Sequence, residues 1–226
     1  MAKLASECRI GGMLSGKAGV MYFHTGHGSD RLRTLRELVA NTDVPITQLL
    51  PTHVTKSPEL WDESIAWVKA GGYIDITARD KGTFQTLAKA KLQHESDESF
   101  SMDRIICSSD SYGSLPRFDE HGNLISYGIA SPGALLTYVK EMYFSHMWSL
   151  ADVLAPITSN PARFLKLDGK GRIDVGECAD ILILDRHTLD LQYVIAKGEV
   201  CRTPKYTKRG MTEPGGGPAM REEPKP

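Results

Sequence analysis

Three residues with metal-binding side chains each follow a short apolar run in this sequence. His24 follows VMYF, His53 follows LLPT, and Asp110 follows IICSS. Imidazole nitrogens and a carboxylate are suitable ligands for zinc or a similar divalent ion. In parallel βα barrels the active site is built where strands end and the following loops begin. We therefore predict a metal site formed by His24, His53 and Asp110.

Each of these residues also has a structural interpretation. A histidine beside apolar residues is commonly packed and hydrogen-bonded without any ligand. Asp110 precedes Ser-Tyr-Gly, and an aspartate in that position often caps a turn. The recurrence of the same placement at the ends of successive runs favours ligation over three separate packing roles.

The elements that would position these residues alternate between strand and helix. Short apolar segments are typical of buried strands, and the segments between them carry apolar residues at helical spacing. We expect the first of these helices to begin at a Ser/Asp cap at 29–30 and the second at a Ser57 cap before Pro58. Such alternation indicates parallel βα units. We predict an α/β fold with about four units, a partial TIM-type (βα) barrel. The expected strands cover 19–24, 46–54, 73–77 and 104–110, and the expected helices cover 29–42, 57–72, 83–94 and 132–146.

The character of the chain changes beyond the fourth unit. A long loop containing Gly and Pro follows Asp110, and a helix pair is expected at 149–167, with Ser149 as a cap and Asn160-Pro161 starting the second helix. Two segments with Gly turns, GRIDVGECADILILD and YVIAKGEV, contain short strand-like pieces and indicate part of a small C-terminal β-sandwich appendage. The predicted division is a partial hydrolase barrel at 1–168, the β segment at 169–208, and a disordered tail at 209–226 that is rich in Gly, Pro and charge.

Composition excludes several classes of function. The 226 residues carry a formal net charge of −1, which gives no electrostatic footprint for nucleic acid or an anionic membrane. No apolar run approaches the ~20 residues that span a bilayer, and the N-terminus lacks the apolar segment of a signal peptide. The four cysteines have neither zinc-ribbon nor redox spacing, so we expect a reduced, cytoplasmic protein.

Several segments resemble one enzyme family. GRIDVGECADILILD, preceded by SNPARFLKL, resembles the C-terminal signature of the amidohydrolase superfamily. FHTG, LLPTHV, GGYIDIT and SSDSYGSLPRFDEHGNL resemble the isoaspartyl dipeptidases, which remove β-linked aspartyl residues from dipeptides. The resemblance runs from about Leu4 to about Lys208. It implies zinc-dependent hydrolysis of a small β-aspartyl dipeptide by a metal-bridged hydroxide.

The resemblance also implies roles for individual residues. In the family's two-zinc site, His24 and His53 would ligate one metal, and Asp110 would ligate the other and act as general base. Ser114 would help to bind the free ends of the substrate. Lys56 stands where the family carries an arginine that holds a substrate carboxylate, and an ammonium cannot form the bidentate fork of a guanidinium.

The family's upstream His-x-His motif and bridging lysine have no counterpart in this chain, so the resemblance covers only the C-terminal portion of the enzyme. Half a barrel has open sheet edges and an uncovered core face, from which we expect a homo-oligomer. Two alternatives stay open. One is a non-catalytic interaction module or pseudoenzyme derived from an amidohydrolase. The other is a different amidohydrolase, such as a dihydroorotase or an aminoacylase-like enzyme.

Overall fold

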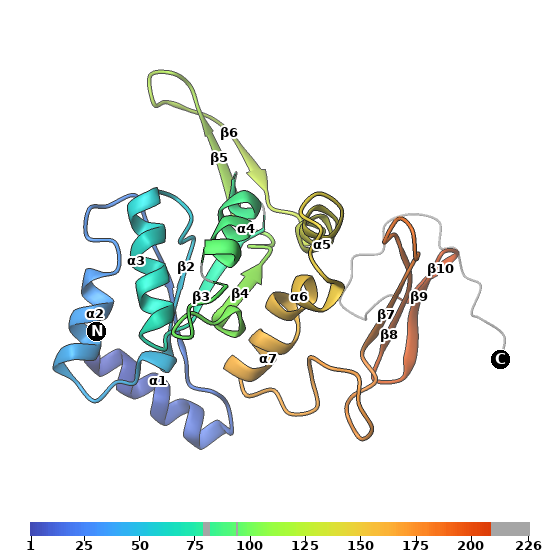
Figure 1. Cartoon of the computed structure of the whole chain (residues 1–226), viewed down its shortest axis with the longest axis horizontal. Helices are drawn as coiled ribbons and strands as arrows, with labels where there is room; N and C mark the ends of the chain where they lie inside the picture. Colours follow the sequence, from blue (N-terminus) through green and yellow to red (C-terminus); the bar gives the residue numbers. More distant parts are fainter. Residues whose placement is uncertain (79–81, 94, 209–226) are drawn as a thin grey trace. The chain divides into compact units, whose positions relative to one another are not determined.

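A computed structural model of the chain describes residues 1–78, 82–93 and 95–208 (Figure 1). The predicted tail at 209–226 lies outside the described residues. The chain divides into two compact units, Met1–Leu167 and a second unit from Asp168 onward. The first unit contains a parallel sheet in the order β1-β2-β3-β4, which confirms the predicted α/β class. Its strands are β1 (Met21–His24), β2 (Leu49–Thr52), β3 (Ile74–Thr77) and β4 (Ile105–Ser108).

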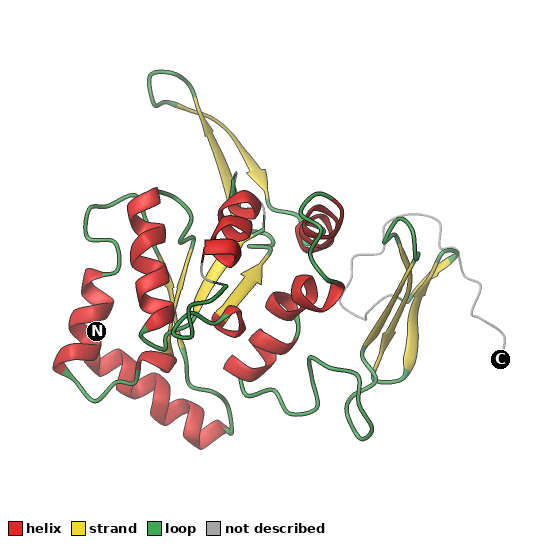
Figure 2. Ribbon diagram, in the orientation of Figure 1, coloured by secondary structure: helices red, strands yellow, loops and turns green. Residues whose placement is uncertain are grey.

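Helices follow or precede each of these strands (Figure 2). Within the described ranges, no helix is both long and apolar enough to cross a membrane. The α-helices are α1 (Ala2–Ser15), α2 (Arg33–Asn41), α3 (Pro58–Lys69), α4 (Thr83–Gln93), α5 (Ala134–Phe144), α6 (Leu150–Leu154) and α7 (Ser159–Phe164), and the 3-10 helices are η1 (Ile46–Gln48), η2 (Met102–Arg104) and η3 (Ala155–Ile157).

Two of the predicted helix caps are confirmed. The Ser57 hydroxyl accepts a hydrogen bond from the backbone N–H of Leu60 at 3.2 Å and starts α3. The Ser149 hydroxyl accepts one from the N–H of Asp152 at the same distance and starts α6. A side-chain oxygen at this position satisfies one of the N–H groups that the first helical turn leaves unpaired.

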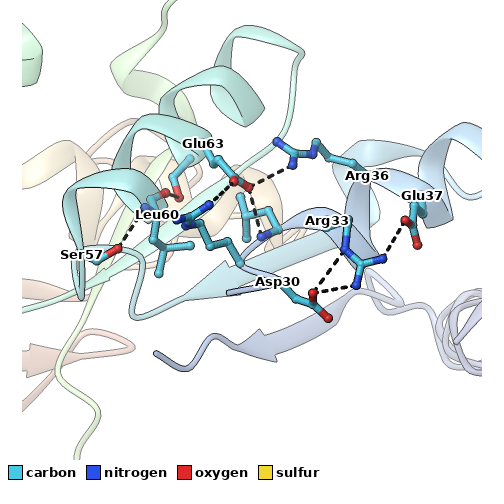
Figure 3. A network of polar contacts seen from close by, with 10 residues as sticks. Asp30, Arg33, Arg36, Glu37, Ser57, Leu60 and Glu63 are labelled. Atoms are coloured by element: carbon cyan, nitrogen blue, oxygen red, sulfur yellow. Dashed lines mark hydrogen bonds and ion pairs between the residues drawn. The ribbon is translucent and has the colours of Figure 1, made fainter. Parts of the chain in front are cut away.

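The predicted Ser/Asp cap of α2 is wrong. The helix begins at Arg33, and the Asp30 carboxylate forms an ion pair with the Arg33 guanidinium at 2.6 Å instead of capping (Figure 3). Glu63 of α3 contacts the N-terminus of α2 instead. Its carboxylate accepts a hydrogen bond from the Leu32 N–H at 3.3 Å and pairs with Arg36 at 3.1 Å. Glu63, 31 positions from Leu32 in sequence, thus binds the helix N-terminus that local pattern assigned to Ser29 or Asp30.

The two faces of the parallel sheet differ in character. The strand register places Ile74, Ile76, Ile105 and Cys107 on one face, where each is at most 4% exposed, and α3 contacts β3. Cys107 is the buried core thiol that its position in an apolar strand predicts. The opposite face carries an apolar cluster near the beginning of the strands and polar side chains toward their ends. That cluster consists of Leu50, Tyr73, Ile106 and Phe164, with Val20 packed against it.

The long loop expected after Asp110 is in part a β-hairpin, so that prediction is wrong. β5 (Ser114–Phe118) and β6 (Leu124–Ile129) form a separate two-stranded antiparallel sheet that extends away from the parallel sheet (Figure 1). Asp119 closes the turn, because its carboxylate accepts from the N–H groups of His121 and Asn123.

The second unit contains an antiparallel sheet in the order β10-β9-β8-β7. The segment GRIDVGECADILILD contains β7, and the segment YVIAKGEV contains the end of β8 and the start of β9. The strands are β7 (Ile181–Leu184), β8 (Leu191–Ala196), β9 (Glu199–Thr203) and β10 (Tyr206–Thr207).

The N-terminal helix α1 was not predicted from the sequence. It contains the glycine pair Gly11-Gly12, which lowers helix propensity by about 1 kcal/mol per residue. Gly12 is required by a close backbone approach, since a Cβ there would lie 2.4 Å from the Cα of Gly19. Gly19 itself has a φ of +65°, in the left-handed region that favours glycine. The helix is also tied to the sheet region, because the Gln48 side chain donates to the Ala5 carbonyl at 2.6 Å.

We predict opposite effects of alanine at the two adjacent glycines. Gly12→Ala places a methyl group against the backbone of Gly19 and should lower the free energy of unfolding by about 1–3 kcal/mol. Gly11→Ala meets no atom within 4 Å and should leave stability unchanged or raise it by up to ~1 kcal/mol. Urea unfolding followed by circular dichroism measures both. Equal effects of the two variants would contradict the packing of Gly12 on Gly19.

Candidate metal centre

The structure brings His24 and His53 together at the carboxyl ends of β1 and β2. His24 is the last residue of β1, and His53 immediately follows β2. The Nδ1 atom of His24 lies 3.1 Å from the Nε2 atom of His53, and the ring centroids are 5.1 Å apart. Parallel pairing of the two strands accounts for this, because it aligns their ends at one edge of the sheet.

His53 has a backbone conformation that few non-glycine residues adopt. Its φ is +60°, which lies in the left-handed region and costs of order 1 kcal/mol or more. The strand ends at this residue, and the ring turns toward His24 instead of following the alternation of the strand. The Thr77 hydroxyl, 2.7 Å from the His53 Nδ1, fixes the ring from the next strand. Such a second contact is common for histidines that bind metals, where it sets the tautomer and the ring orientation.

The histidine pair fits two corners of a metal site. Zinc–nitrogen distances are about 2.0–2.1 Å, so two nitrogens on one tetrahedral ion are separated by roughly 3.3 Å. The observed separation of 3.1 Å is close to that value. Within the described ranges, however, no group of three or more His, Cys, Asp or Glu side chains is gathered closely enough to hold an ion. The described residues therefore provide a two-histidine arrangement, and Asp110 does not complete a three-ligand cluster with it.

Asp110 lies in a tight turn after β4. Its carbonyl accepts from the Gly113 N–H at 3.0 Å, and its φ of +49° is left-handed. Ser109, not the Asp110 carboxylate, accepts from the Ser111 N–H within this turn. Gly113 packs directly on Asp110, since a Cβ at residue 113 would lie 2.9 Å from the carboxylate oxygen Oδ1. The close contact makes glycine necessary for the present position of the carboxylate.

The two predicted substrate-binding residues occupy different surroundings. The Lys56 ammonium donates to the carbonyl of Thr25 at 2.8 Å and so lies beside the residue that follows His24. An ammonium has three donors, and this bond uses one of them. Ser114 is the exposed first residue of β5, four positions after Asp110.

A buried carboxylate beneath the histidines was missed in the sequence. Asp75, in the middle of β3, is 1% exposed, and its Oδ2 accepts three hydroxyl hydrogen bonds. The donors are Tyr22 of β1 at 2.6 Å, Thr52 of β2 at 2.5 Å and Ser108 of β4 at 2.8 Å. One oxygen thus connects all four strands. The available signal was an aspartate inside the apolar run YIDIT, at a position that strand alternation places on the same face as Thr77.

Burial and, to a smaller extent, the charge of Asp110 raise the pKa of Asp75 from 3.8 to about 6, against the opposing effect of the three hydroxyl donors. The other oxygen, Oδ1, is buried and has no hydrogen-bond partner among the described residues. A proton on Oδ1 would therefore leave the three bonds to Oδ2 in place. Burial also raises the pKa of Tyr22, with the neighbouring Asp75 charge as the second cause, so the Tyr22 hydroxyl stays a donor.

Comparison with known proteins identifies the family. The sequence profile described as "Amidohydrolase family" matches residues 67–208, which is more than half of the chain. The chain belongs to the amidohydrolase family. A curated dihydroorotase of Endomicrobium trichonymphae is 35% identical over 75 residues, which are 31% of this chain and 18% of that protein.

The chain is similar to crystal structures of a β-aspartyl dipeptidase from Fervidobacterium islandicum AW-1. The complex with a β-Asp-Leu dipeptide is 34% identical, with a TM-score of 0.81 over 94% of this chain and 55% of that one. A second structure of that enzyme is 30% identical, with a TM-score of 0.77 over 93% and 53%. Enamidase, at 14% identity and a TM-score of 0.56, shares the fold. The chain thus spans about half the length of the dipeptidase that it resembles.

We predict that Asp75 makes the folded state less stable as pH rises. Its pKa in the folded state is raised, so the favourable contribution of the protonated form is fully present below about pH 4 and is lost as pH rises through about 6. The shift corresponds to roughly 3 kcal/mol. The difference in unfolding free energy between the wild type and Asp75→Asn should fall with pH across this window. Urea unfolding at pH 4, 5, 6 and 7 measures it, and a difference independent of pH would contradict the raised pKa.

We also predict that zinc binding depends on the histidine pair. His53→Ala removes one of two nitrogens 3.1 Å apart and should weaken binding of Zn²⁺ at least about tenfold. His121→Ala, in the exposed turn of the hairpin, should leave the affinity unchanged. Isothermal titration of the metal-free chain with ZnCl₂ at pH 7 measures both. Equal losses from the two variants would show that zinc binds elsewhere.

Proposed function

We propose that this chain carries part of the catalytic site of a zinc-dependent hydrolase of β-aspartyl dipeptides. The observation that carries the proposal is the His24–His53 pair at adjacent strand ends, in a chain 34% identical to a β-aspartyl dipeptidase over 94% of its length. The dihydroorotase match covers only 18% of that protein, which favours a dipeptidase function over the function of another amidohydrolase. The proposed substrate is a small dipeptide with a β-linked aspartyl residue.

Each proposed site residue has a separate task. His24 and His53 would hold zinc, with His53 kept in place by Thr77. When bound, zinc supplies Lewis acidity that polarises the amide carbonyl and lowers the pKa of water. Asp110 would accept a proton from the attacking water and pass it to the leaving amine.

The proposed substrate contacts come from Lys56 and Ser114. Lys56 would bind a substrate carboxylate with the donors that its bond to the Thr25 carbonyl leaves available. Its single charged group gives a weaker and less directional contact than an arginine fork. Ser114, exposed at the start of β5, would donate its hydroxyl to a free end of the dipeptide.

The larger architecture is part of the same proposal. We infer that the four parallel strands are one half of a TIM-type barrel and that the antiparallel sheet of the second unit is part of a β-sandwich. The fold shared with enamidase and the dipeptidase supports this inference. A cytoplasmic location also belongs to the proposal.

A non-catalytic role is the second candidate. It is favoured by the absence of a three-ligand group among the described residues, because catalytic zinc sites usually have three protein ligands. Under this alternative the chain would bind a β-aspartyl dipeptide or another polypeptide without turning over substrate.

The test is hydrolysis of β-Asp-Leu by the zinc-loaded chain, with α-Asp-Leu as the control substrate. We expect release of leucine from the β-linked dipeptide alone. Asp110→Asn should lower kcat about 10²- to 10⁴-fold by removing the proton acceptor. Lys56→Ala should raise KM roughly 10- to 100-fold, because a hydrogen bond to a charged group contributes about 1.5–3 kcal/mol.

Two controls separate the candidates. His121→Ala should retain wild-type kinetics, since its side chain lies in the exposed hairpin turn. Titration of the zinc-loaded chain with β-Asp-Leu reports binding independently of turnover. Binding without any leucine release would support the non-catalytic role, and neither binding nor release would refute both the hydrolase and a non-catalytic role in binding β-aspartyl dipeptides.

A further inference from the structure

The β5–β6 hairpin exposes an unusually apolar strand. β6 reads Leu-Ile-Ser-Tyr-Gly-Ile and contains neither a charge nor a proline. Ile125, Tyr127 and Ile129 are 66%, 68% and 72% exposed. An isolated two-stranded hairpin is marginally stable in water, and an apolar edge strand without charge or proline readily pairs with another strand.

The pattern of hydrogen bonds in the hairpin shows which backbone groups of β6 point away from β5. Ala130 donates to the Gly113 carbonyl, and Pro116, which has no N–H, lies opposite Tyr127. Residue pairs in an antiparallel ladder alternate between bonded and non-bonded, so Pro116 and Tyr127 form a non-bonded pair. The N–H and C=O of Tyr127 therefore point to the outer edge of β6. The outer edge of β5 is interrupted by Pro116, which cannot donate there.

The exposed edge is nearly symmetric about Tyr127. In an antiparallel pairing of two copies centred on this residue, Tyr127 faces Tyr127, Ile125 faces Ile129, and Ser126 faces Gly128. The isoleucines and the tyrosine then form one continuous apolar row, and the two small residues share the opposite side. A register shift in the hairpin makes Ile125 the extra residue on β6, so its backbone groups are also available.

We propose that the β6 edge is a docking surface for a second copy of this chain, forming the four-stranded antiparallel sheet β5-β6-β6-β5 about a two-fold axis. A two-fold contact needs a surface that complements itself, and the Ile-Ser-Tyr-Gly-Ile stretch does so. The exposed apolar side chains of β6 itself, Leu124, Ile125, Tyr127 and Ile129, offer roughly 400–500 Å². A standard interface uses about 800 Å² per partner, so we expect a weak dimer with a dissociation constant of roughly tens of micromolar.

Sedimentation velocity of the full chain from about 1 to 200 μM tests the association. We expect a monomer–dimer equilibrium that ends at the dimer. Tyr127→Lys places two like charges at the two-fold axis and should raise the dissociation constant at least tenfold, equivalent to about 1.4 kcal/mol. Phe118→Lys adds the same charge to the exposed part of β5, on the strand that Pro116 blocks, and should retain the dimer.

Disulfide trapping tests the register. A bonded antiparallel pair has a Cα–Cα distance of about 5.5 Å, within the range that a disulfide spans. In a background with Cys8, Cys178 and Cys201 replaced by serine, Tyr127→Cys should form a covalent dimer on mild oxidation, and Phe118→Cys should not. A monomer at all concentrations, a dimer that survives Tyr127→Lys, or growth beyond the dimer would each overturn the proposal.

Discussion

One carboxylate oxygen of Asp75 accepts hydrogen bonds from hydroxyl groups on three other strands, and the face of the sheet is organised around it. The apolar cluster around Tyr73 and Phe164 lies toward the beginning of the strands, and His24 and His53 lie at their ends. A buried carboxylate is costly unless it is bonded, and each bond here also fixes the height of one strand relative to β3. The histidines meet because the strands that carry them are held in register below.

Local pattern was sufficient for those parts of the site that depend on strand ends. His24 and His53 could be placed together because parallel neighbours align their carboxyl ends, and that needs only the order of the strands. The contact of Lys56 with the Thr25 carbonyl and the three bonds to Asp75 could not be predicted in this way. Both depend on side chains that meet across strands, and an aspartate inside an apolar strand carries no sign of its partners.

The incorrect fold predictions also have physical reasons. Local pattern predicts a Ser/Asp cap at 29–30, whereas Asp30 pairs with Arg33 and Glu63 of the neighbouring helix accepts from the N–H of Leu32. The Gly and Pro content of the segment after Asp110 predicts a loop, but Pro116 lies opposite Tyr127 in a non-bonded pair, where its missing N–H costs the hairpin no hydrogen bond. The helix α1 was missed because Gly11-Gly12 disfavours a helix locally, and only the contact with Gly19 shows why a glycine is kept there.

The left-handed conformation of His53 sets thermodynamic stability against the proposed zinc ligation at a single residue. Glycine adopts a φ of +60° without steric penalty, so the backbone of this turn would be more relaxed with glycine than with any imidazole. Selection for thermostability alone would therefore favour the replacement of histidine at position 53. Histidine at this position is a strained residue for which the proposed zinc ligation is the compensating benefit, and laboratory evolution toward heat resistance should replace it early.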